Sequence, residues 1–388
     1  MAPTDLTEER SELGRSLLAR GAMTPDWQNA FEAVPRSAFL PEVMWPFDMD
    51  SGTHVTVDVR EEPALWLSYA DADVPIVTQW DDGASGDGPV RVPTSSASMP
   101  SVVFRMLRDL DVQPGHKVLE IGTGTGWNAA LLAHRLGVDR VTSIEIDPTV
   151  ADTARSRLAA QELLGVVLTR DGALGDPSGA PFDRVIATAG IRAVPPQWIT
   201  QTRPGGIIVA PWGTHFSNAD ARVRLSVDTA EASGHFTGPV EFMKLRAQRL
   251  PFDGHDEYLS GGMAGAERST TEVTETELLG EGRFDPRTFA IGLRVRDCHH
   301  SVADKRDGAR PVWFYGLTDR SWACVMFRDG REAAVWQAGP RQLWDNVLEA
   351  LGWWLEAGKP GFERFGLTAA ADGSQHAWLD SPKDAWPV

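Results

Sequence analysis

Short apolar runs alternate with amphipathic segments between residues 117 and 213. The apolar runs predict strands, and they read "KVLEIG", "RVTSIEID", "GVVLTRDG", "FDRVIATAG" and "PGGIIVAPWG". The segments that follow the first two runs, "WNAALLAHRLG" and "PTVADTARSRLAAQELL", have the periodicity of helices. Strands and helices that alternate at this spacing predict an α/β fold, with a parallel sheet covered by helices on both faces.

The part of the chain before this alternation predicts helices and loops. Residues 5–20 and 24–34 have the pattern of two short helices, and a third helix is expected after Pro100. Residues 36–92 are rich in Asp, Pro and Trp, so we expect them to be irregular, with a flexible loop at 80–90.

The pattern changes again after residue 250. Residues 251–275 are polar and predict a linker, and "WACVMF" and "REAAVWQA" beyond them predict a hairpin. Residues 341–358 predict an amphipathic helix, and 376–380 predict a last strand. The apolar stripe of that helix would consist of Leu343, Val347, Leu351 and Leu355.

Two domains are expected, because 388 residues are many for one hydrophobic core. The first would span residues 1–250, with its α/β core at about 100–246 and a further strand at 240–246. The second would be a smaller α+β accessory domain at 276–388, after the linker.

The composition indicates a protein of the cytoplasm. A net charge of −17 disfavours a nucleic-acid partner, since phosphate contacts need a basic surface. The only cysteines, Cys298 and Cys324, cannot form a disulfide framework and are typical of a reducing compartment. No apolar run is long enough to predict a membrane span, and the N-terminus lacks the pattern of a signal peptide.

A glycine-rich turn after the first strand is the strongest candidate for a ligand site. The turn reads Gly-x-Gly-x-Gly, with an acid two residues before its first glycine. A dinucleotide site requires Gly-x-Gly-x-x-Gly, whereas a preceding acid suits the ammonium and sulfonium groups of S-adenosyl-L-methionine. The pattern therefore favours a methyl-donor site, with a dinucleotide site or a turn without a ligand as alternatives. The residues predicted to bind the cofactor from this turn are Glu120, Gly122, Thr123, Gly124, Thr125, Gly126, Trp127 and Asn128.

Polar residues also stand where the next strands end. Glu145, with Ile146 beside it, is about 20 residues further on, where an acid can accept hydrogen bonds from ribose hydroxyls. Asp171 and Gly172 follow the third strand, and suit an adenine ring and its amino group. Thr188 follows the fourth strand. Because open α/β sheets bind ligands at the carboxyl ends of their strands, these residues complete the predicted cofactor site.

Taken together, these motifs resemble the protein-L-isoaspartate O-methyltransferase family. The likeness extends from about residue 24 to 246, and includes a Tyr-x-Asp segment ending in Pro, followed by a Ser-x-Pro step. It implies a Rossmann-like class I S-adenosyl-L-methionine-dependent methyltransferase fold with an N-terminal helical cap. The resemblance assigns Ser98 to the carboxylate of the substrate, as the catalytic residue; capping of the following helix is the alternative. It also suggests substrate contacts by Tyr69, Asp71, Pro75, Ser95, Ser96 and Met99.

Two departures from that family bear on the substrate. Trp127 replaces the usual Tyr after the glycine turn, and about 110 residues form the additional accessory domain. The longer chain resembles an actinobacterial-type branch that methylates an Asp in ribosomally made, modified peptides. We therefore expect a cross-linked or macrocyclic peptide partner, recognised by the accessory domain, whose methyl ester closes to an aspartimide. General repair of isoaspartyl proteins, methylation of a small carboxylic acid, and a non-enzymatic cofactor-binding scaffold are the alternatives.

The chemistry implied by the resemblance needs neither a metal nor a general base. A carboxylate is ionised at neutral pH, so the enzyme has only to align it with the methyl group and exclude water; S-adenosyl-L-homocysteine is then the second product. The sequence Cys298-His299-His300 is compact, but adjacent residues rarely converge on one metal ion. The sequence does not decide the oligomeric state, and a monomer is favoured.

Overall fold

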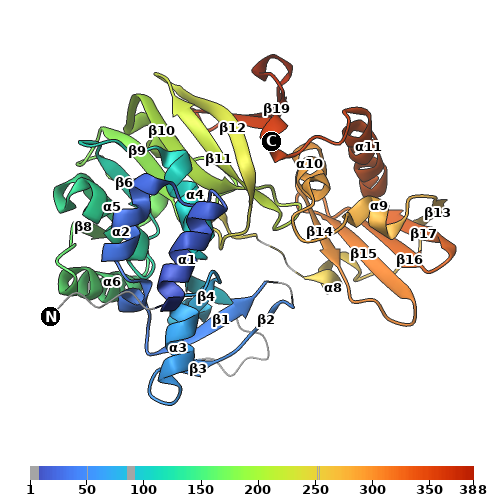
Figure 1. The fold of residues 1–388 in the computed structure, drawn as a ribbon. Helices are drawn as coiled ribbons and strands as arrows, with labels where there is room; N and C mark the ends of the chain where they lie inside the picture. Colours follow the sequence, from blue (N-terminus) through green and yellow to red (C-terminus); the bar gives the residue numbers. More distant parts are fainter. Residues whose placement is uncertain (1–7, 50, 85–91, 251, 253) are drawn as a thin grey trace. The chain divides into compact units, whose positions relative to one another are not determined.

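The computed structural model describes residues 8–49, 51–84, 92–250, 252 and 254–388 (Figure 1). Its contacts divide the chain into two compact units. The first contains residues up to Ala189, with Pro195–Ala210 and Arg224–Ala232. The second contains Gly190–Val194, Pro211–Val223 and Ser233–Val388. No helix within the described ranges is long and apolar enough to cross a bilayer.

A parallel sheet forms the centre of the first unit, as the alternating pattern predicted. Its strands are hydrogen-bonded in the order β10-β9-β6-β7-β8, and each neighbouring pair is parallel. Their bounds are β6 Val118–Ile121, β7 Val141–Glu145, β8 Val166–Thr169, β9 Phe182–Ala187 and β10 Thr202–Trp212. Since both β6 and β9 are buried throughout or nearly so, the sheet is the core of this unit.

Helices connect these strands and cover the sheet (Figure 1). α5 (Trp127–Leu136) and α6 (Pro148–Ala160) join β6 to β7 and β7 to β8, moving in one direction along the sheet. α7 (Pro196–Thr200) joins β9 to β10 in the opposite direction. Because such crossovers are right-handed, α7 lies on the face opposite α5 and α6, which confirms the doubly wound arrangement.

The N-terminal part contains more regular structure than the sequence predicted. Helices α1 (Glu8–Ala19), α2 (Gln28–Ala33) and α4 (Pro100–Leu110) confirm the predicted helices, although residues 1–7 lie outside the described part. The prediction that residues 36–92 are irregular was wrong. That segment holds α3 and most of a small antiparallel sheet, which share a buried core around Met44, Trp66 and Ile76. These elements are α3 Pro63–Ala70, β1 Val43–Asp48, β2 Thr53–His54, β3 Val57–Asp58, β4 Ile76–Trp80 and β5 Pro93–Ala97.

The flexible loop predicted at 80–90 falls mostly on residues that the structure does not describe. Of that range, Trp80 ends β4 and Asp81–Gly83 form a 3-10 turn, whereas 85–90 lie outside the described residues. The backbone N–H of Asp81 donates to the carbonyl of Val92 at 2.8 Å, so the two ends of the loop are held together.

The large sheet continues beyond β10 in the order β11-β12-β18-β19-β20. These strands are β11 Asp220–Val227, β12 Glu231–Val240, β18 Phe365–Ala370, β19 Gln375–Leu379 and β20 Trp386–Pro387. β19 confirms the strand predicted at 376–380, although it is not the last one, since β20 follows it. The strand predicted at 240–246 was wrong, because β12 ends at Val240 and only an isolated bridge joins Lys244 to Gly190.

A second antiparallel sheet belongs to the C-terminal part of the second unit, with the order β13-β17-β16-β15-β14. β16 and β17 form the predicted hairpin. The segment predicted as a linker contains α8 and β13, and β13 pairs with β17. In α11 the predicted stripe is buried except at Leu355, which is 46% exposed. The bounds are β13 Glu267–Thr271, β14 Cys298–Val302, β15 Ala309–Gly316, β16 Trp322–Arg328, β17 Arg331–Ala338, α8 His255–Tyr258, α9 Glu275–Leu279, α10 Pro286–Arg294 and α11 Leu343–Glu356.

Candidate functional site

The glycine-rich turn between β6 and α5 has the conformation that only glycine adopts readily. Gly122, Gly124 and Gly126 have φ angles of 92°, 53° and 94°. A Cβ atom on Gly122 would lie 2.7 Å from Oγ1 of Thr188, which follows β9 and donates to the carbonyl of Gly122. The turn therefore lies close against the carboxyl end of β9. The sequence predicted that the turn and Thr188 would meet at this edge of the sheet.

Glu120, the acid before the turn, is fully buried in β6. Its Oε1 accepts a hydrogen bond from Nδ2 of Asn128 at 2.7 Å, and its Oε2 accepts one from the hydroxyl of Ser143. Burial raises the pKa of this carboxyl from 4.5 to about 7, although both hydrogen bonds favour the ionised form. In the structure Glu120 joins β6 to α5 and β7, and a direct contact with a cationic ligand stays a prediction.

Glu145 connects the end of β7 to the same turn. Its Oε2 accepts from the backbone N–H of Gly124 at 2.9 Å, and its Oε1 accepts from the N–H of Asp147 at 3.1 Å. The side chain is partly exposed, and its neighbour Ile146 is 38% exposed. An oriented carboxylate beside an exposed apolar side chain suits a ribose with an attached base.

The end of β8 adds a second acid with an apolar neighbour. Oδ1 of Asp171 accepts from the N–H of Ala173 at 2.9 Å, whereas Oδ2 accepts no hydrogen bond from the residues that the structure describes. A Cβ atom on Gly172 would overlap the side chain of Ile121, so this backbone lies directly on β6. Leu174 is 54% exposed beside it. Sequence reasoning missed Leu174, since one exposed leucine in a loop gives no signal by itself.

Three residues of the turn have side chains directed into the protein. Thr123 is buried and its hydroxyl lies 2.6 Å from that of Ser143, and Thr125 is buried as well. The indole of Trp127 is buried and donates to the carbonyl of Val34 at 3.1 Å. The backbone N–H of Thr123 donates to the carbonyl of Ile144 at 3.2 Å. The backbone N–H groups of Thr125 and Trp127, just before and at the start of α5, are what remains for the predicted cofactor contacts.

The Ser-x-Pro step lies between β5 and α4, and reaches the glycine turn through Ser96. A Cβ atom on Gly124 would be 3.6 Å from the carbonyl oxygen of Ser96. Ser98 is partly exposed, and Ser95 is buried with its hydroxyl 3.2 Å from that of Thr78. The N-cap of α4 is Met99, without a side-chain hydrogen bond, so the alternative that Ser98 caps this helix is wrong.

Arg36 holds this step in place, and sequence reasoning missed it. Its buried guanidinium donates to the carbonyls of Ala97 and Ser98 at 2.9 and 3.0 Å, and to those of Ala72 and Val74 at 3.3 and 2.9 Å. Burial lowers its pKa to about 9, still above neutrality. An Arg between Pro35 and an apolar stretch is the only sequence signal that could have indicated it.

The Tyr-x-Asp segment begins in the last turn of α3 and ends just before β4. Tyr69 packs against the small-sheet core, Asp71 is buried at the C-terminus of α3, and the carbonyl of Pro75 accepts from the N–H of Phe47 at 2.9 Å. The contact with α4 comes instead from Asp73, whose Oδ1 accepts from the N–H of Ser101 at 2.8 Å. Substrate contacts by Tyr69, Asp71 and Pro75 stay predictions.

The remaining polar clusters of the sequence bond to protein groups. Nδ1 of His299 and Nδ1 of His300 lie 3.2 and 2.7 Å from the carbonyl oxygens of His215 and Phe216. Within the described ranges, no group of three or more His, Cys, Asp or Glu is arranged to hold a metal ion. His255, in the segment predicted as a linker, begins α8, and its Nδ1 lies 2.8 Å from the hydroxyl of Tyr315.

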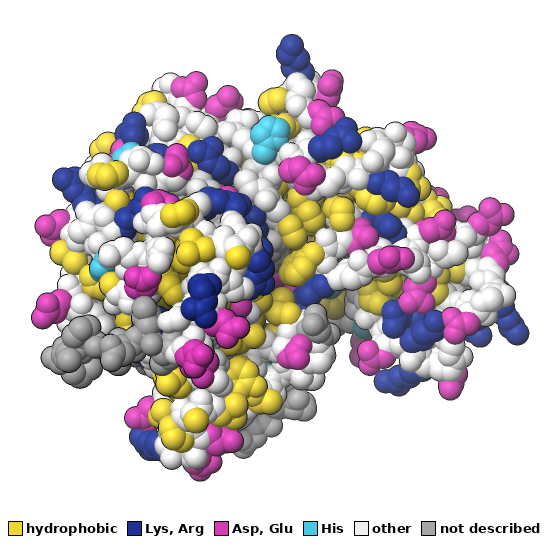
Figure 2. Space-filling model, in the orientation of Figure 1, with side chains coloured by type: hydrophobic (Ala, Val, Ile, Leu, Met, Phe, Trp, Pro, Cys, Tyr) yellow, Lys and Arg dark blue, Asp and Glu magenta, His cyan; other side chains and the backbone are white. Residues whose placement is uncertain are grey.

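Acidic and basic side chains are interspersed over the face of the molecule shown in Figure 2.

The glycine-rich turn, Glu145 and Asp171 together fit S-adenosyl-L-methionine. The turn allows close approach of the backbone, Glu145 offers a carboxylate for the ribose, and Asp171 offers a carboxylate oxygen near exposed apolar side chains. The fold and this site define a class I S-adenosyl-L-methionine-dependent methyltransferase.

Comparison with known proteins identifies the family. Residues 67–248 match the family model described as Protein-L-isoaspartate(D-aspartate) O-methyltransferase (PCMT). Proteins named protein-L-isoaspartate O-methyltransferase from Ignicoccus hospitalis and Rhodopseudomonas palustris are each 33% identical to this chain. The alignments cover 53% and 60% of this chain and 82% and 89% of those proteins. The chain belongs to the protein-L-isoaspartate O-methyltransferase family.

A solved structure named protein-L-isoaspartate O-methyltransferase resembles the chain over a longer range. The two share a TM-score of 0.54 at 20% sequence identity, and the alignment covers 96% of this chain and all of the other. This likeness shows the fold alone.

Proposed function

We propose that this enzyme methylates the side-chain carboxylate of isoaspartyl residues in polypeptides. The family supports the reaction class, and the approach of Ser96 to Gly124 is the observation that carries the assignment. It brings the Ser-x-Pro step, where the substrate carboxylate is expected, next to the turn that is expected to hold the methyl donor. A cofactor-binding scaffold is disfavoured, because the glycines and both strand-end acids are all present.

The residues of the chain would act by position rather than by proton transfer. Bound S-adenosyl-L-methionine supplies an electrophilic methyl group. Glu145 would accept hydrogen bonds from the ribose hydroxyls, and Asp171 would accept one from the adenine amino group. The hydroxyl of Ser98 would donate to one oxygen of the substrate carboxylate and so orient the other. Since the carboxylate is already ionised, alignment and exclusion of water supply the catalysis.

A second candidate substrate is a normal Asp in a cross-linked ribosomal peptide. It is favoured by the length of the C-terminal part, residues 249–388, which the family model leaves unmatched. In this case the backbone nitrogen of the next residue attacks the methyl ester, a C–N bond forms, and methanol leaves with the proton of that nitrogen. The product is an aspartimide held in the constrained peptide.

Mass spectrometry of three peptides tests these proposals. The peptides share one sequence and contain a linear isoaspartyl residue, a linear Asp, or an Asp within a lactone- or thioether-bridged ring. Each is incubated with the enzyme and S-adenosyl-L-methionine. For the main proposal we expect the linear isoaspartyl peptide to gain one methyl ester and then to form a succinimide, while the linear Asp peptide is unchanged.

The outcomes separate the candidates. Methylation of the bridged Asp alone, followed by loss of methanol, would replace the main proposal with the second. The product would then be lighter than the starting peptide by one water. No methylation of any of the three peptides, by protein that binds S-adenosyl-L-methionine in a calorimetric titration, would overturn both and revive the scaffold alternative.

A further inference from the structure

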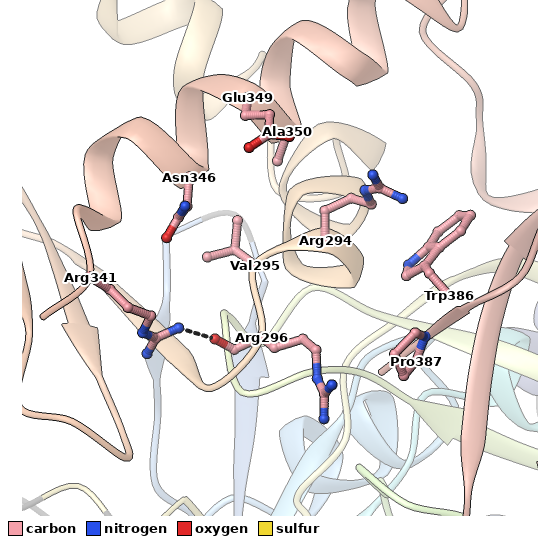
Figure 3. A pocket seen from close by; sticks show the side chains of 9 residues that line it. All are labelled: Arg294, Val295, Arg296, Arg341, Asn346, Glu349, Ala350, Trp386 and Pro387. Carbon is pink, nitrogen blue, oxygen red and sulfur yellow. Dashed lines mark hydrogen bonds between the residues drawn. The ribbon is translucent and has the colours of Figure 1, made fainter.

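A cavity of about 390 Å³ in the second unit carries positive charge that the proposed reaction does not use (Figure 3). It lies between the end of α10, the start of α11 and β20. Figure 3 shows Arg294 and Trp386 on one side, Arg341 on the opposite side, and Asn346 and Glu349 on the helix between them. The volume is within the range of sites that bind small ligands or side chains.

Arg294 is positioned by aromatic rings rather than by an acid. Its guanidinium carbon lies 4.9 Å from the ring centres of both Trp353 and Trp386. The indole of Trp386 is itself fixed, since its Nε1 donates to the carbonyl of Leu293 at 2.8 Å. Contacts of this kind hold a guanidinium in place and leave its N–H groups for another partner.

Arg341 is held by groups of the protein, whereas Arg294 and Arg296 are not. Arg341 donates to the carbonyls of Arg296 and Asp297 at 2.7 and 2.8 Å and to the carboxylate of Asp319, so it shapes the wall of the cavity. The side chains of Arg294 and Arg296 are exposed and donate no hydrogen bond to any group in the described part of the chain. The N–H groups of two guanidiniums are therefore available to a ligand. The lining contains one acidic residue, Glu349, so its net charge is positive.

We propose that this cavity binds acidic side chains of the peptide substrate, apart from the residue that is methylated. The proposal rests on the proposed function, because that function makes a polypeptide the substrate. Figure 3 shows the guanidiniums of Arg294 and Arg296 pointing toward different ends of the cavity, so each would donate to a carboxylate of its own. Asn346 and Glu349 offer the donor and acceptors that peptide groups need, and Trp386 offers apolar contact. A phosphate dianion fits this lining less well, since Glu349 would repel it.

The test uses two isoaspartyl peptides that differ only in three residues other than the methylated one, which are Glu in one and Gln in the other. The wild-type enzyme should have a KM about tenfold lower for the Glu peptide, as expected for charge-assisted hydrogen bonds. The double variant Arg294→Gln/Arg296→Gln should lose this preference by a rise in the KM for the Glu peptide. The kcat of both peptides and the KM of the Gln peptide should not change.

Two further variants distinguish binding from folding. Arg140→Gln removes an exposed arginine at the amino end of β7 and should leave both KM values unchanged. Arg294→Lys should keep part of the preference, because it keeps the charge. An equal rise in both KM values in the double variant, or a wild-type enzyme without a preference, would overturn the proposal.

If the wild-type enzyme methylates neither peptide, the proposed function fails and the cavity is tested by binding alone. Fluorescence anisotropy of a labelled triglutamate peptide should show weaker binding, by about tenfold, to the double variant than to the wild type. Equal binding to both proteins would overturn the proposal.

Discussion

At the scale of single residues, the site depends on buried polar groups whose partners are distant in sequence. Glu120 illustrates this: its partners Asn128 and Ser143 belong to the following helix and the neighbouring strand. The sequence identified the acid from its place before the turn. It could not show that the carboxyl is fully buried, because burial depends on how the strands pair.

The raised pKa of Glu120 predicts a pH-dependent stability. Between pH 4.5 and about 7 the folded protein retains a proton on Glu120 that the unfolded chain has released. This contribution is therefore complete below pH 4.5 and is lost as the pH rises through about 7. Relative to the variant Glu120→Gln, whose amide does not titrate, the wild type should lose about 1–3 kcal/mol of unfolding free energy from about pH 4.5 to about pH 8.

Urea denaturation of both proteins across this range measures the difference. A Ser143→Ala variant removes a hydrogen bond that favours the ionised carboxyl, so its loss of stability should occur at higher pH. Parallel stability curves for wild type and Glu120→Gln would contradict the prediction.

Ser98 is the residue on which the proposed chemistry most depends. We expect Ser98→Ala to lower kcat by about 10- to 100-fold, because the substrate carboxylate loses the donor that orients it. The affinity for S-adenosyl-L-methionine, measured by calorimetry, should remain unchanged. Ser96→Ala is the matched control and should have a smaller effect on kcat. An equal loss of cofactor affinity in Ser98→Ala would instead place Ser98 in the cofactor site.

At the scale of elements, close packing between strands fixes the sheet of the second unit. Gly366 in β18 lies opposite Trp378 in β19, and a Cβ atom there would overlap the indole. That indole is 2% exposed and donates to Oγ1 of Thr368 at 3.2 Å, so it has little room to move. Gly352 in α11 is different, since a Cβ atom there meets nothing within 4 Å.

This contrast predicts opposite effects of the same substitution. Gly366→Ala should destabilise the protein by about 1–3 kcal/mol through overpacking. Gly352→Ala should stabilise it by about 0.5–1 kcal/mol, because alanine restricts the unfolded chain and favours the helix. Thermal and urea denaturation of the two variants measure both effects. A loss of stability in both, or in neither, would show that packing at Gly366 does not constrain β18 and β19.

Periodicity predicted the elements that obey one simple pattern and missed those that do not. The strands of the parallel sheet are continuous apolar runs, and they were found together with α5, α6 and α11. β1 contains Pro46 and β5 is mostly Ser, Thr and Pro, so neither resembles a strand in isolation. Such edge and mixed segments become strands through their neighbours, since β4 pairs with both. For the same reason Arg36 was missed, although it joins four carbonyls of the site.

At the scale of the whole molecule, the division of the chain differs from a cut at one linker. The composition indicated a boundary near residue 250. The second unit nevertheless includes Pro211–Val223 and residues 233–240 as well as the C-terminal residues. Segments that the sequence assigns to the α/β core therefore share contacts with the end of the chain, as Val194 and Trp212 do with Gln375, 181 and 163 positions later.

These shared contacts predict that a chain ending at residue 250 does not fold stably. It would expose the edge of β12 that pairs with β18, and remove Phe289, whose ring centre lies 4.9 Å from that of Phe236. It would also remove Gln375, whose Oε1 accepts from the N–H of Val194 at 2.9 Å and from Nε1 of Trp212 at 3.3 Å. We expect the shortened chain to aggregate or to melt without cooperativity.

The matched control keeps every non-covalent contact and breaks only the backbone. A protease site inserted after Phe252 in the full-length protein is cleaved once the protein has folded. The cleaved protein should remain soluble and melt cooperatively, because residues 253–388 stay bound. Thermal melting of the chain ending at residue 250, of the cleaved protein and of the intact protein tests this prediction. If the chain ending at residue 250 melts at the temperature of the full-length protein, the contacts of β12, Trp212 and Phe236 with the C-terminal residues do not stabilise the fold.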